Sequence, residues 1–246
     1  MTIITSKSNN LIKKTKKLLQ KKYRKTSYLI EGWHLFEEAQ KSGATFLNIF
    51  VVEDMAERLV GFERVTVVSP EVLKELTDSP APQGIIVEVA LEKTDWTQLS
   101  TGRFLVLEDV QDPGNVGTMV RTADAAGFDA VFLSNKSADL YNQKTLRSMQ
   151  GSHFHLPIFR VEMDSFLDFC RDQRQPVIAT TLSDQSVDYK TLPRLDSFAL
   201  VMGNEGQGIS EKMEKRTDYL AHITMPGHAE SLNVAVAAGI LIFSLI

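Results

Sequence analysis

Three segments in the second half of the chain join an apolar run to a polar or glycine-rich turn. The run at residues 104–108 stops at Asp109, the run at 198–202 is followed at once by the glycine-rich residues 203–208, and the turn at 225–230 leads into an apolar C-terminal helix. Apolar runs bounded by turns and alternating with helical segments are typical of buried parallel strands. Because such sheets bind ligands at the carboxyl ends of their strands, we expect the three turns to form one composite site.

The same alternation predicts an α/β fold in two domains, residues 1–95 and 96–246, joined by the polar stretch 92–101. In the first domain a basic helix precedes strands at 28–30, 46–52, 65–68 and 84–89 and helices at 32–42 and 71–76. In the second, a parallel sheet is expected from strands at 104–107, 130–133, 155–159, 177–180, 198–202 and 220–223, with helices at 116–126, 142–149, 163–173, 209–217 and 229–245. Asn115 and Ser210 are the expected caps of two of these helices, and Ser231 and Asn233 lie where the last one opens.

Basic side chains are concentrated at the N-terminus of a chain whose net charge is −4. Residues 1–30 contain nine lysines and arginines and no acid, whereas the other 216 residues carry 18 basic and 31 acidic side chains. This asymmetry predicts a basic arm that binds RNA phosphates. The candidate RNA-binding residues are Lys7, Lys13, Lys14, Lys17, Lys21 and Arg24, with Arg147 as a more distant one. The alternative is an amphipathic helix whose lysines are only solvated.

Several protein classes are disfavoured by the composition. Cys170 is the single cysteine, so no intramolecular disulfide can form, and the first residues show no apolar signal region. No apolar run reaches the roughly 18 residues of a membrane span. The five histidines lack carboxylate or cysteine neighbours at ligand spacing, so we expect no metal. A cytoplasmic protein that binds no metal and no membrane is the expectation.

The three turns carry motifs that resemble those of the SpoU/TrmH family of RNA ribose 2′-O-methyltransferases, which belongs to the SPOUT superfamily. In chain order the motifs are Asn115-x-Gly117-x-x-x-Arg121, Gly203-Asn204-Glu205-Gly206-x-Gly208 and Ser231-Leu232-Asn233-Val234. The resemblance covers residues 102–246, and the chain departs from it at Thr224 and Ala235. In the first domain Ser6-x-x-Asn9, the lysine run and Glu31-Gly32 resemble a ribosomal-protein-like (L30e-like) RNA-binding domain.

The resemblance implies a deep C-terminal trefoil knot, a homodimer with sites completed across its interface, and S-adenosylmethionine as the cofactor. The cofactor-binding residues that it implies are Thr180, Thr181, Leu182, Gly203, Asn204, Ile223, Met225 and Leu232. The implied catalytic residues are Arg121, Asn115, Glu205, Ser231 and Asn233. Asn115 has a second interpretation as a helix cap, and Glu205 has one as a solvated loop acid.

The family's proposed catalytic residue corresponds to Arg121. Arginine stays protonated at working pH, so we prefer a clamp on a phosphate or on the developing oxyanion to a general base. Both roles stay open at the level of sequence.

The predicted function is transfer of a methyl group to a ribose 2′-OH in structured RNA, with 23S ribosomal RNA favoured over transfer RNA. A catalytically silent RNA-binding module of the same fold is one alternative, and a nucleotide-dependent oxidoreductase is another. Which nucleotide is modified, whether free RNA or a ribosomal particle is the substrate, and any link to antibiotic resistance are not specified by these patterns.

Overall fold

The computed structural model describes residues 3–92 and 94–246, and these divide into two compact units. The first contains residues 3–92 together with Asp139–Phe154, and the second contains Thr94–Ala138 and His155–Ile246. The assignment of residues 139–154 to the first unit was not anticipated. The predicted boundary between domains 1–95 and 96–246 stays a prediction.

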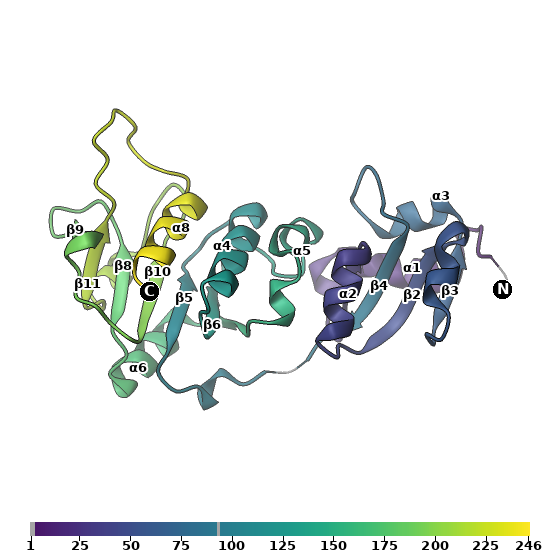
Figure 1. The fold of residues 1–246 in the computed structure, drawn as a ribbon, viewed down its shortest axis with the longest axis horizontal. Coiled ribbons are helices and arrows are strands. Elements are labelled where there is room, and N and C mark those ends of the chain that lie inside the picture. The colour runs from purple at the N-terminus through teal and green to yellow at the C-terminus, as the bar shows by residue number, and fades with distance from the viewer. Residues whose placement is uncertain (1–2, 93) are drawn as a thin grey trace. The chain divides into compact units, whose positions relative to one another are not determined.

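The first unit is a four-stranded sheet covered by helices (Figure 1). Its strand order is β1 (Ser27–Glu31), β4 (Ile85–Ala90), β2 (Phe46–Val52) and β3 (Val65–Val68), antiparallel except for the β2–β3 pair. Its helices are α1 (Asn10–Lys16), α2 (Trp33–Lys41), α3 (Pro70–Leu73) and α5 (Gln143–Met149), with 3-10 turns η1 (Lys17–Leu19), η2 (Lys21–Tyr23), η3 (Glu53–Leu59), η4 (Lys74–Leu76) and η6 (Ser152–Phe154).

Helix α1 is amphipathic, which explains where its lysines lie. The side chain of Asn9 caps the helix by accepting a hydrogen bond from Leu11 N at 2.9 Å. Ile12 is completely buried in a core with Phe50 and Val72. The lysines of the helix therefore face solvent.

The second unit is built on a seven-stranded sheet in which every neighbouring pair is parallel, as predicted. Its order is β7 (Ile158–Val161), β6 (Ala130–Ser134), β5 (Arg103–Leu107), β10 (Phe198–Met202), β8 (Val177–Thr180), β11 (Tyr219–His222) and β9 (Val187–Asp188). The helices are α4 (Pro113–Ala125), α6 (Met163–Gln173), α7 (Glu211–Glu214) and α8 (Val234–Ser244), with turns η5 (Trp96–Gln98) and η7 (Tyr189–Thr191).

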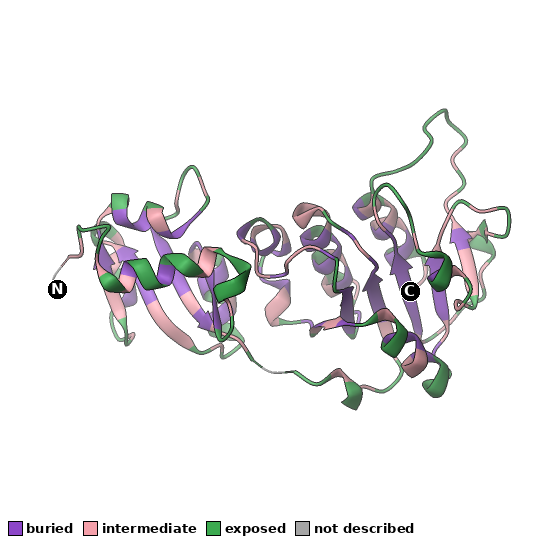
Figure 2. Ribbon diagram, turned by 180° about the vertical axis from the view of Figure 1, so that it is seen from behind, coloured by how far each residue is buried: buried purple, intermediate pink, exposed green. Residues whose placement is uncertain are grey.

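The central strands of this sheet are buried on both faces (Figure 2). Phe104, Phe132 and Phe166 form the centre of one core, beneath α6. Helices α4 and α8 pack against each other (Figure 1). Burial on both faces explains why these strands are apolar runs without alternation.

Two helices, α4 and α8, begin three or more residues from their predicted starts. Helix α4 starts at Pro113, and its cap is Asp112, whose carboxylate accepts a hydrogen bond from Asn115 N at 2.9 Å. Asn115 is therefore not the cap, because proline is well suited to the first helical position after an aspartate. Helix α8 starts at Val234 and not at residue 229, because the side chain of Asn233 caps it and the preceding segment is irregular.

Smaller differences affect the lengths of other elements. The strand expected at 155–159 is β7, displaced toward the C-terminus, and the helix expected at 209–217 shortens to α7. Ser210 does cap α7, by accepting a hydrogen bond from Met213 N at 3.1 Å. The short strand β9 was not predicted.

Candidate functional site

A cavity of about 580 Å³ lies where β8, β10 and β11 end at their carboxyl edges. Its lining includes all eight residues predicted to bind the cofactor: Thr180, Thr181, Leu182, Gly203, Asn204, Ile223, Met225 and Leu232. Glu205 and Ser231 line the same cavity. The second and third motifs therefore meet at one edge of the sheet, as parallel-strand geometry requires.

The glycine-rich loop after β10 is closed tightly on itself. Asn204 and Gly208 exchange two backbone hydrogen bonds of 2.9 Å each. A Cβ atom on Gly203 would lie 2.3 Å from the carbonyl carbon of Gly208, so no other residue fits without moving the loop. Gly203 is thus required by the close approach of two backbone segments.

The side chain of Asn204 fixes this loop to the end of β5. Its Nδ2 donates to the carbonyl oxygen of Asp109 at 2.8 Å, while its Oδ1 accepts from Gly206 N and Gln207 N at 2.9 Å. Asp109 has a φ of +57°, a conformation that few non-glycine residues adopt. Asn204 therefore supports the loop through its side chain, in addition to lining the cavity.

Glu108 and Asp109 were missed as functional candidates. The buried carboxylate of Glu108 accepts hydrogen bonds from both Ser210 N, at 2.9 Å, and Ser210 Oγ, at 2.7 Å. Asp109 accepts from Ser134 Oγ at 2.7 Å. The sequence signal for these two residues was a pair of acids directly after an apolar run. Polar side chains at the end of a strand are placed where they can reach a ligand site.

A chain of hydrogen bonds connects one residue from each motif. Asn115 Nδ2 donates to Glu205 Oε1 at 3.1 Å, and Asn233 Nδ2 donates to Asn115 Oδ1 at 3.1 Å. The carboxylate of Glu205 also accepts from Gln111 N at 3.1 Å and Asp112 N at 3.0 Å. Glu205 is therefore a structural acceptor and not only a solvated loop acid.

These contacts keep Glu205 ionised. Burial alone would raise the pKa of its carboxyl, but the hydrogen bonds from Asp112 N, Asn115 and Gln111 N outweigh that effect and lower the pKa. The oxygens of Glu205 are thus occupied by donors, and this carboxylate is a poor proton acceptor for a substrate hydroxyl.

Arg121 is on the exposed surface of α4 and is not among the residues that line the cavity. Within residues 3–92 and 94–246 its guanidinium has no hydrogen bond or ion pair. Of the five predicted catalytic residues, Asn115, Glu205 and Asn233 are linked by hydrogen bonds. Ser231 lines the cavity, and Arg121 does not.

The predicted RNA-binding residues differ in their surroundings. Lys13, Lys14, Lys17 and Lys21 are exposed and have no ion pair in the described part of the chain. Lys7 Nζ is 2.8 Å from Glu75 Oε1, and Lys16 pairs with the same carboxylate. Arg147 is paired with Asp78 at 2.6 Å.

Arg24 was predicted to bind RNA, and its position argues otherwise. Its side chain is only 5% exposed, it pairs with Asp139, and it donates to the carbonyl oxygens of Leu18 at 2.9 Å and Leu19 at 3.1 Å. The guanidinium is buried in the first unit, where these contacts hold it. Arg24 is therefore a structural residue.

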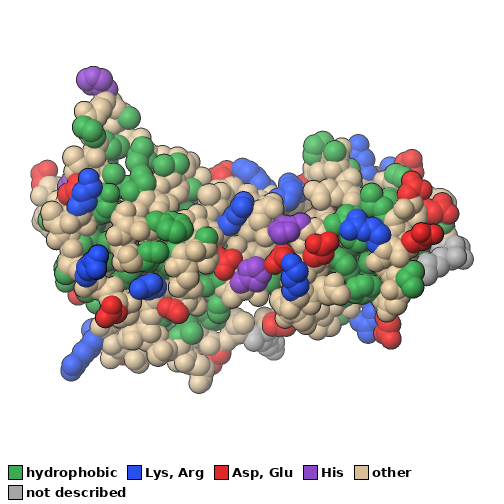
Figure 3. Space-filling view, viewed as in Figure 1, with side chains coloured by type: hydrophobic (Ala, Val, Ile, Leu, Met, Phe, Trp, Pro, Cys, Tyr) green, Lys and Arg blue, Asp and Glu red, His purple; other side chains and the backbone are tan. Residues whose placement is uncertain are grey.

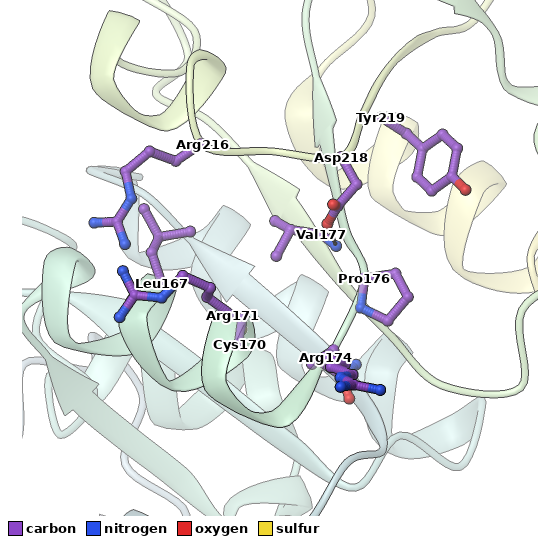
Figure 4. A pocket seen from close by; sticks show the side chains of 10 residues that line it. Leu167, Cys170, Arg171, Arg174, Pro176, Val177, Arg216, Asp218 and Tyr219 are labelled. Carbon is purple, nitrogen blue, oxygen red and sulfur yellow. Dashed lines mark hydrogen bonds between the residues drawn. The ribbon is translucent and has the colours of Figure 1, made fainter.

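A second cavity, of about 560 Å³, lies at the opposite edge of the same sheet, by the start of β8 and β11 (Figure 4). Arg171 and Arg216 approach each other on one side of it, and both contact Asp168, at 3.2 and 2.7 Å. Burial raises the pKa of the Cys170 thiol to about 12, so it is not a reactive thiolate. No predicted site residue lies here.

Among the described residues, no group of three or more histidine, cysteine or acidic side chains is arranged to hold a metal ion. In the same part of the chain no helix has the length and apolar character needed to cross a membrane.

The parallel sheet, the closed glycine loop and the three linked motifs define an α/β protein with its ligand cavity at the strand ends. The chain belongs to the SpoU rRNA methylase family, whose model matches residues 102–243. A second model, the MRM3-like substrate binding domain, matches residues 9–87. The resemblance inferred from the motifs is confirmed, and membership of this family argues against the oxidoreductase alternative.

Individual relatives match over the full length. The 23S rRNA (guanosine(2553)-2′-O)-methyltransferase RlmP of Bacillus subtilis is 42% identical over 250 residues, covering 100% of this chain and 99% of its own. An uncharacterized tRNA/rRNA methyltransferase of Synechocystis is 32% identical over 98% of this chain and 92% of its own. The crystal structure of an AdoMet-bound rRNA methyltransferase from Sinorhizobium meliloti superposes with a TM-score of 0.90 at 31% identity, covering 99% of this chain and 97% of that one.

Proposed function

We propose that this protein transfers a methyl group from S-adenosylmethionine to a ribose 2′-OH in 23S ribosomal RNA. The observation that carries the proposal is the single cavity that gathers all eight residues expected to bind the cofactor. The full-length similarity to RlmP favours ribosomal RNA over transfer RNA and a guanosine as the modified nucleotide. A ribosomal RNA substrate supports the expectation that the enzyme is cytoplasmic.

The residues of the cavity suit S-adenosylmethionine. A volume of about 580 Å³ accommodates a nucleoside with its amino acid chain, and Gly203 leaves room for close backbone approach. Leu182 and Leu232 offer apolar surface, and the backbone at Gly203, Ile223 and Met225 offers hydrogen-bonding groups. When bound, the cofactor supplies an electrophilic methyl group.

The chain's own residues then have to position the ribose, whose 2′-OH gives up its proton to solvent as the methyl group is transferred to its oxygen. Asn115 and Asn233 are fixed by their mutual hydrogen bond and by Glu205, so they form a rigid polar edge beside Ser231. Arg121, which stays protonated, stabilises negative charge on a substrate phosphate or on the 2′-oxygen as it loses its proton. Because Arg121 is exposed and does not line the cavity, a contribution from a second copy of the chain is favoured.

A homodimer would provide that second copy. Helix α8 is apolar on all sides: Ala238 and Leu241 are buried, yet Val236 and Phe243 on the other side are 53% and 55% exposed. Figure 3 shows hydrophobic side chains gathered on the surface over α8 and the loop before it. An exposed apolar helix face of this kind is typical of a subunit interface.

Two finer features of the fold are part of the proposal. We expect the C-terminal segment to form a deep trefoil knot, since the family membership implies it and α8 packs on α4 after the chain has completed β11. We expect the first unit to be L30e-like, since its mixed four-stranded sheet is preceded by a basic helix. An experimental structure of the dimer tests both.

Labelled methyl transfer tests the function. The protein is incubated with labelled S-adenosylmethionine and one of three RNA fractions from cells that lack the gene. The fractions are 23S rRNA, ribosomal particles and transfer RNA, and each product is digested to nucleosides. Labelled 2′-O-methylguanosine from the 23S fraction is expected. Label only in transfer RNA would select that alternative, and no label from protein that is stabilised by S-adenosylhomocysteine would select the silent binding module.

A further inference from the structure

An aromatic side chain is exposed in the middle of the basic N-terminal segment. Tyr23, in η2, is 41% exposed, although most large apolar side chains of the first unit are buried. The ammonium groups of Lys22 and Lys17 lie 5.0 and 5.7 Å from the centroid of its ring. The ring therefore attracts cations on its face and remains accessible to solvent.

The backbone around Tyr23 is well fixed, so its exposure is not that of a frayed end. Tyr23 N donates to Gln20 O at 3.1 Å, and Tyr23 O accepts from Lys25 N at 2.9 Å. The buried Arg24 next to it anchors the turn through the carbonyl oxygens of Leu18 and Leu19. The turn thus holds the ring at the surface of the first unit.

The charges around the ring are unbalanced. Six exposed lysines of this segment have no acidic partner among the described residues: Lys13, Lys14, Lys17, Lys21, Lys22 and Lys25. Lysines alone would suit any polyanion. An accessible aromatic ring between them adds a surface on which a nucleobase can stack, and this combination is typical of proteins that bind unpaired nucleotides.

We propose that Tyr23 stacks on an unpaired base of the RNA substrate, with Lys17 and Lys22 moving from the ring to the flanking phosphates. The inference rests on the proposed function for RNA as the partner. It adds that the enzyme holds a loop, bulge or single strand at this position, since bases inside a duplex cannot reach the ring. Tyr23 is in this sense a positioning residue for the substrate.

The test compares the full-length protein with Tyr23→Ala and Tyr23→Phe. Binding is measured by fluorescence anisotropy with two labelled RNAs, a hairpin with an unpaired loop and a fully paired duplex of the same stem. Loss of the stack is expected to weaken hairpin binding by about five- to a hundredfold in Tyr23→Ala, with duplex binding unchanged and Tyr23→Phe like the wild type. In methyl transfer to 23S rRNA the same change should appear mainly in KM.

Tyr189 offers a matched control, because Lys190 Nζ lies 5.7 Å from its ring in the second unit. Tyr189→Ala should bind both RNAs like the wild type. Equal binding of the hairpin by wild type and Tyr23→Ala, or equal losses for hairpin and duplex, would overturn the proposal. Absence of methyl transfer in the wild type would instead reject the proposed function, and the anisotropy comparison would still decide the role of Tyr23.

Discussion

The side-chain amide of Asn115 donates to the carboxylate of Glu205 at 3.1 Å across 90 residues of sequence. Asn233 Nδ2 donates to Asn115 Oδ1 at 3.1 Å, so the first motif is bonded to each of the other two. Substitutions at these positions therefore act on the geometry of the whole site and not on one contact.

Glu205→Gln should lower methyl transfer by roughly tenfold or more. An amide in place of the carboxylate keeps one acceptor oxygen and directs its NH2 group toward either Gln111 N or Asp112 N, and the donor left without an acceptor costs about 1–3 kcal/mol. The measurement is kcat/KM with RNA. Glu211→Gln is the control, because that exposed acid has only a loose pair with Lys215 at 3.6 Å. Equal activity in both variants would contradict the structural role of Glu205.

Gly203→Ala should abolish cofactor binding. The added methyl group would overlap the backbone at Gly208, so the loop has to move away from the cavity. Calorimetric titration with S-adenosylhomocysteine measures the loss. Gly227→Ala serves as the control, since open space surrounds that position. Unchanged affinity in Gly203→Ala would mean that the loop does not contact the ligand.

Arg121→Ala and Ser231→Ala should each be inactive, and mixing them tests where Arg121 acts. If a site takes Arg121 from one subunit and Ser231 from the other, mixed dimers contain one intact site, and random exchange should restore roughly a quarter of the activity. Arg121→Ala alone should still bind S-adenosylhomocysteine. No recovery from verified mixed dimers would place both residues in the same subunit's site.

Val236→Glu should shift the protein to a monomer. A charge on the exposed face of α8 would have to be buried without a partner at the proposed interface. Light scattering after size exclusion gives the mass. Val60→Glu is the control, because Val60 is 83% exposed in the first unit and should leave the dimer intact. A wild-type monomer would reject the interface itself.

The ion pairs of Glu75 predict an acid-sensitive contribution to stability. Hydrogen bonds from Lys16 and Lys7 lower the pKa of this carboxyl from its ordinary 4.5 to about 2. Because the folded-state pKa is depressed, the contribution is complete above about pH 4.5 and is lost as the pH falls toward 2. Melting temperatures of wild type and Glu75→Gln should therefore converge in that range. A constant difference down to pH 2 would show that the ion pairs are not responsible.

The parallel sheet and the cavity could be predicted because their signals are local. Apolar runs identify buried strands, and glycine and polar residues directly after them identify the edge where a ligand binds. The burial of Arg24 could not be predicted because its partner, Asp139, is 115 residues away, and no local pattern distinguishes a buried arginine from an exposed one. The start of α4 was misplaced because Asp112 and Asn115 are both good caps, and only Pro113 distinguishes them.

The roles of Glu108 and Asp109 depend on tertiary contacts that the sequence does not encode locally. Glu108 is held by Ser210, and Asp109 contributes a backbone carbonyl in a left-handed conformation. Two acids directly after an apolar run indicate polar groups at a strand end, but this pattern does not show which groups they will contact.

The assignment of residues 139–154 to the first unit affects how the protein is made. During synthesis the N-terminal 92 residues leave the ribosome well before Asp139, so Arg24 is without its carboxylate partner and Thr77 without Gln143 for that interval. A buried cation without its partner costs several kcal/mol, about 3–5 when such a pair is broken. The first unit should therefore finish folding only after residues 139–154 have also been translated, and a fragment ending at residue 95 should be unstable.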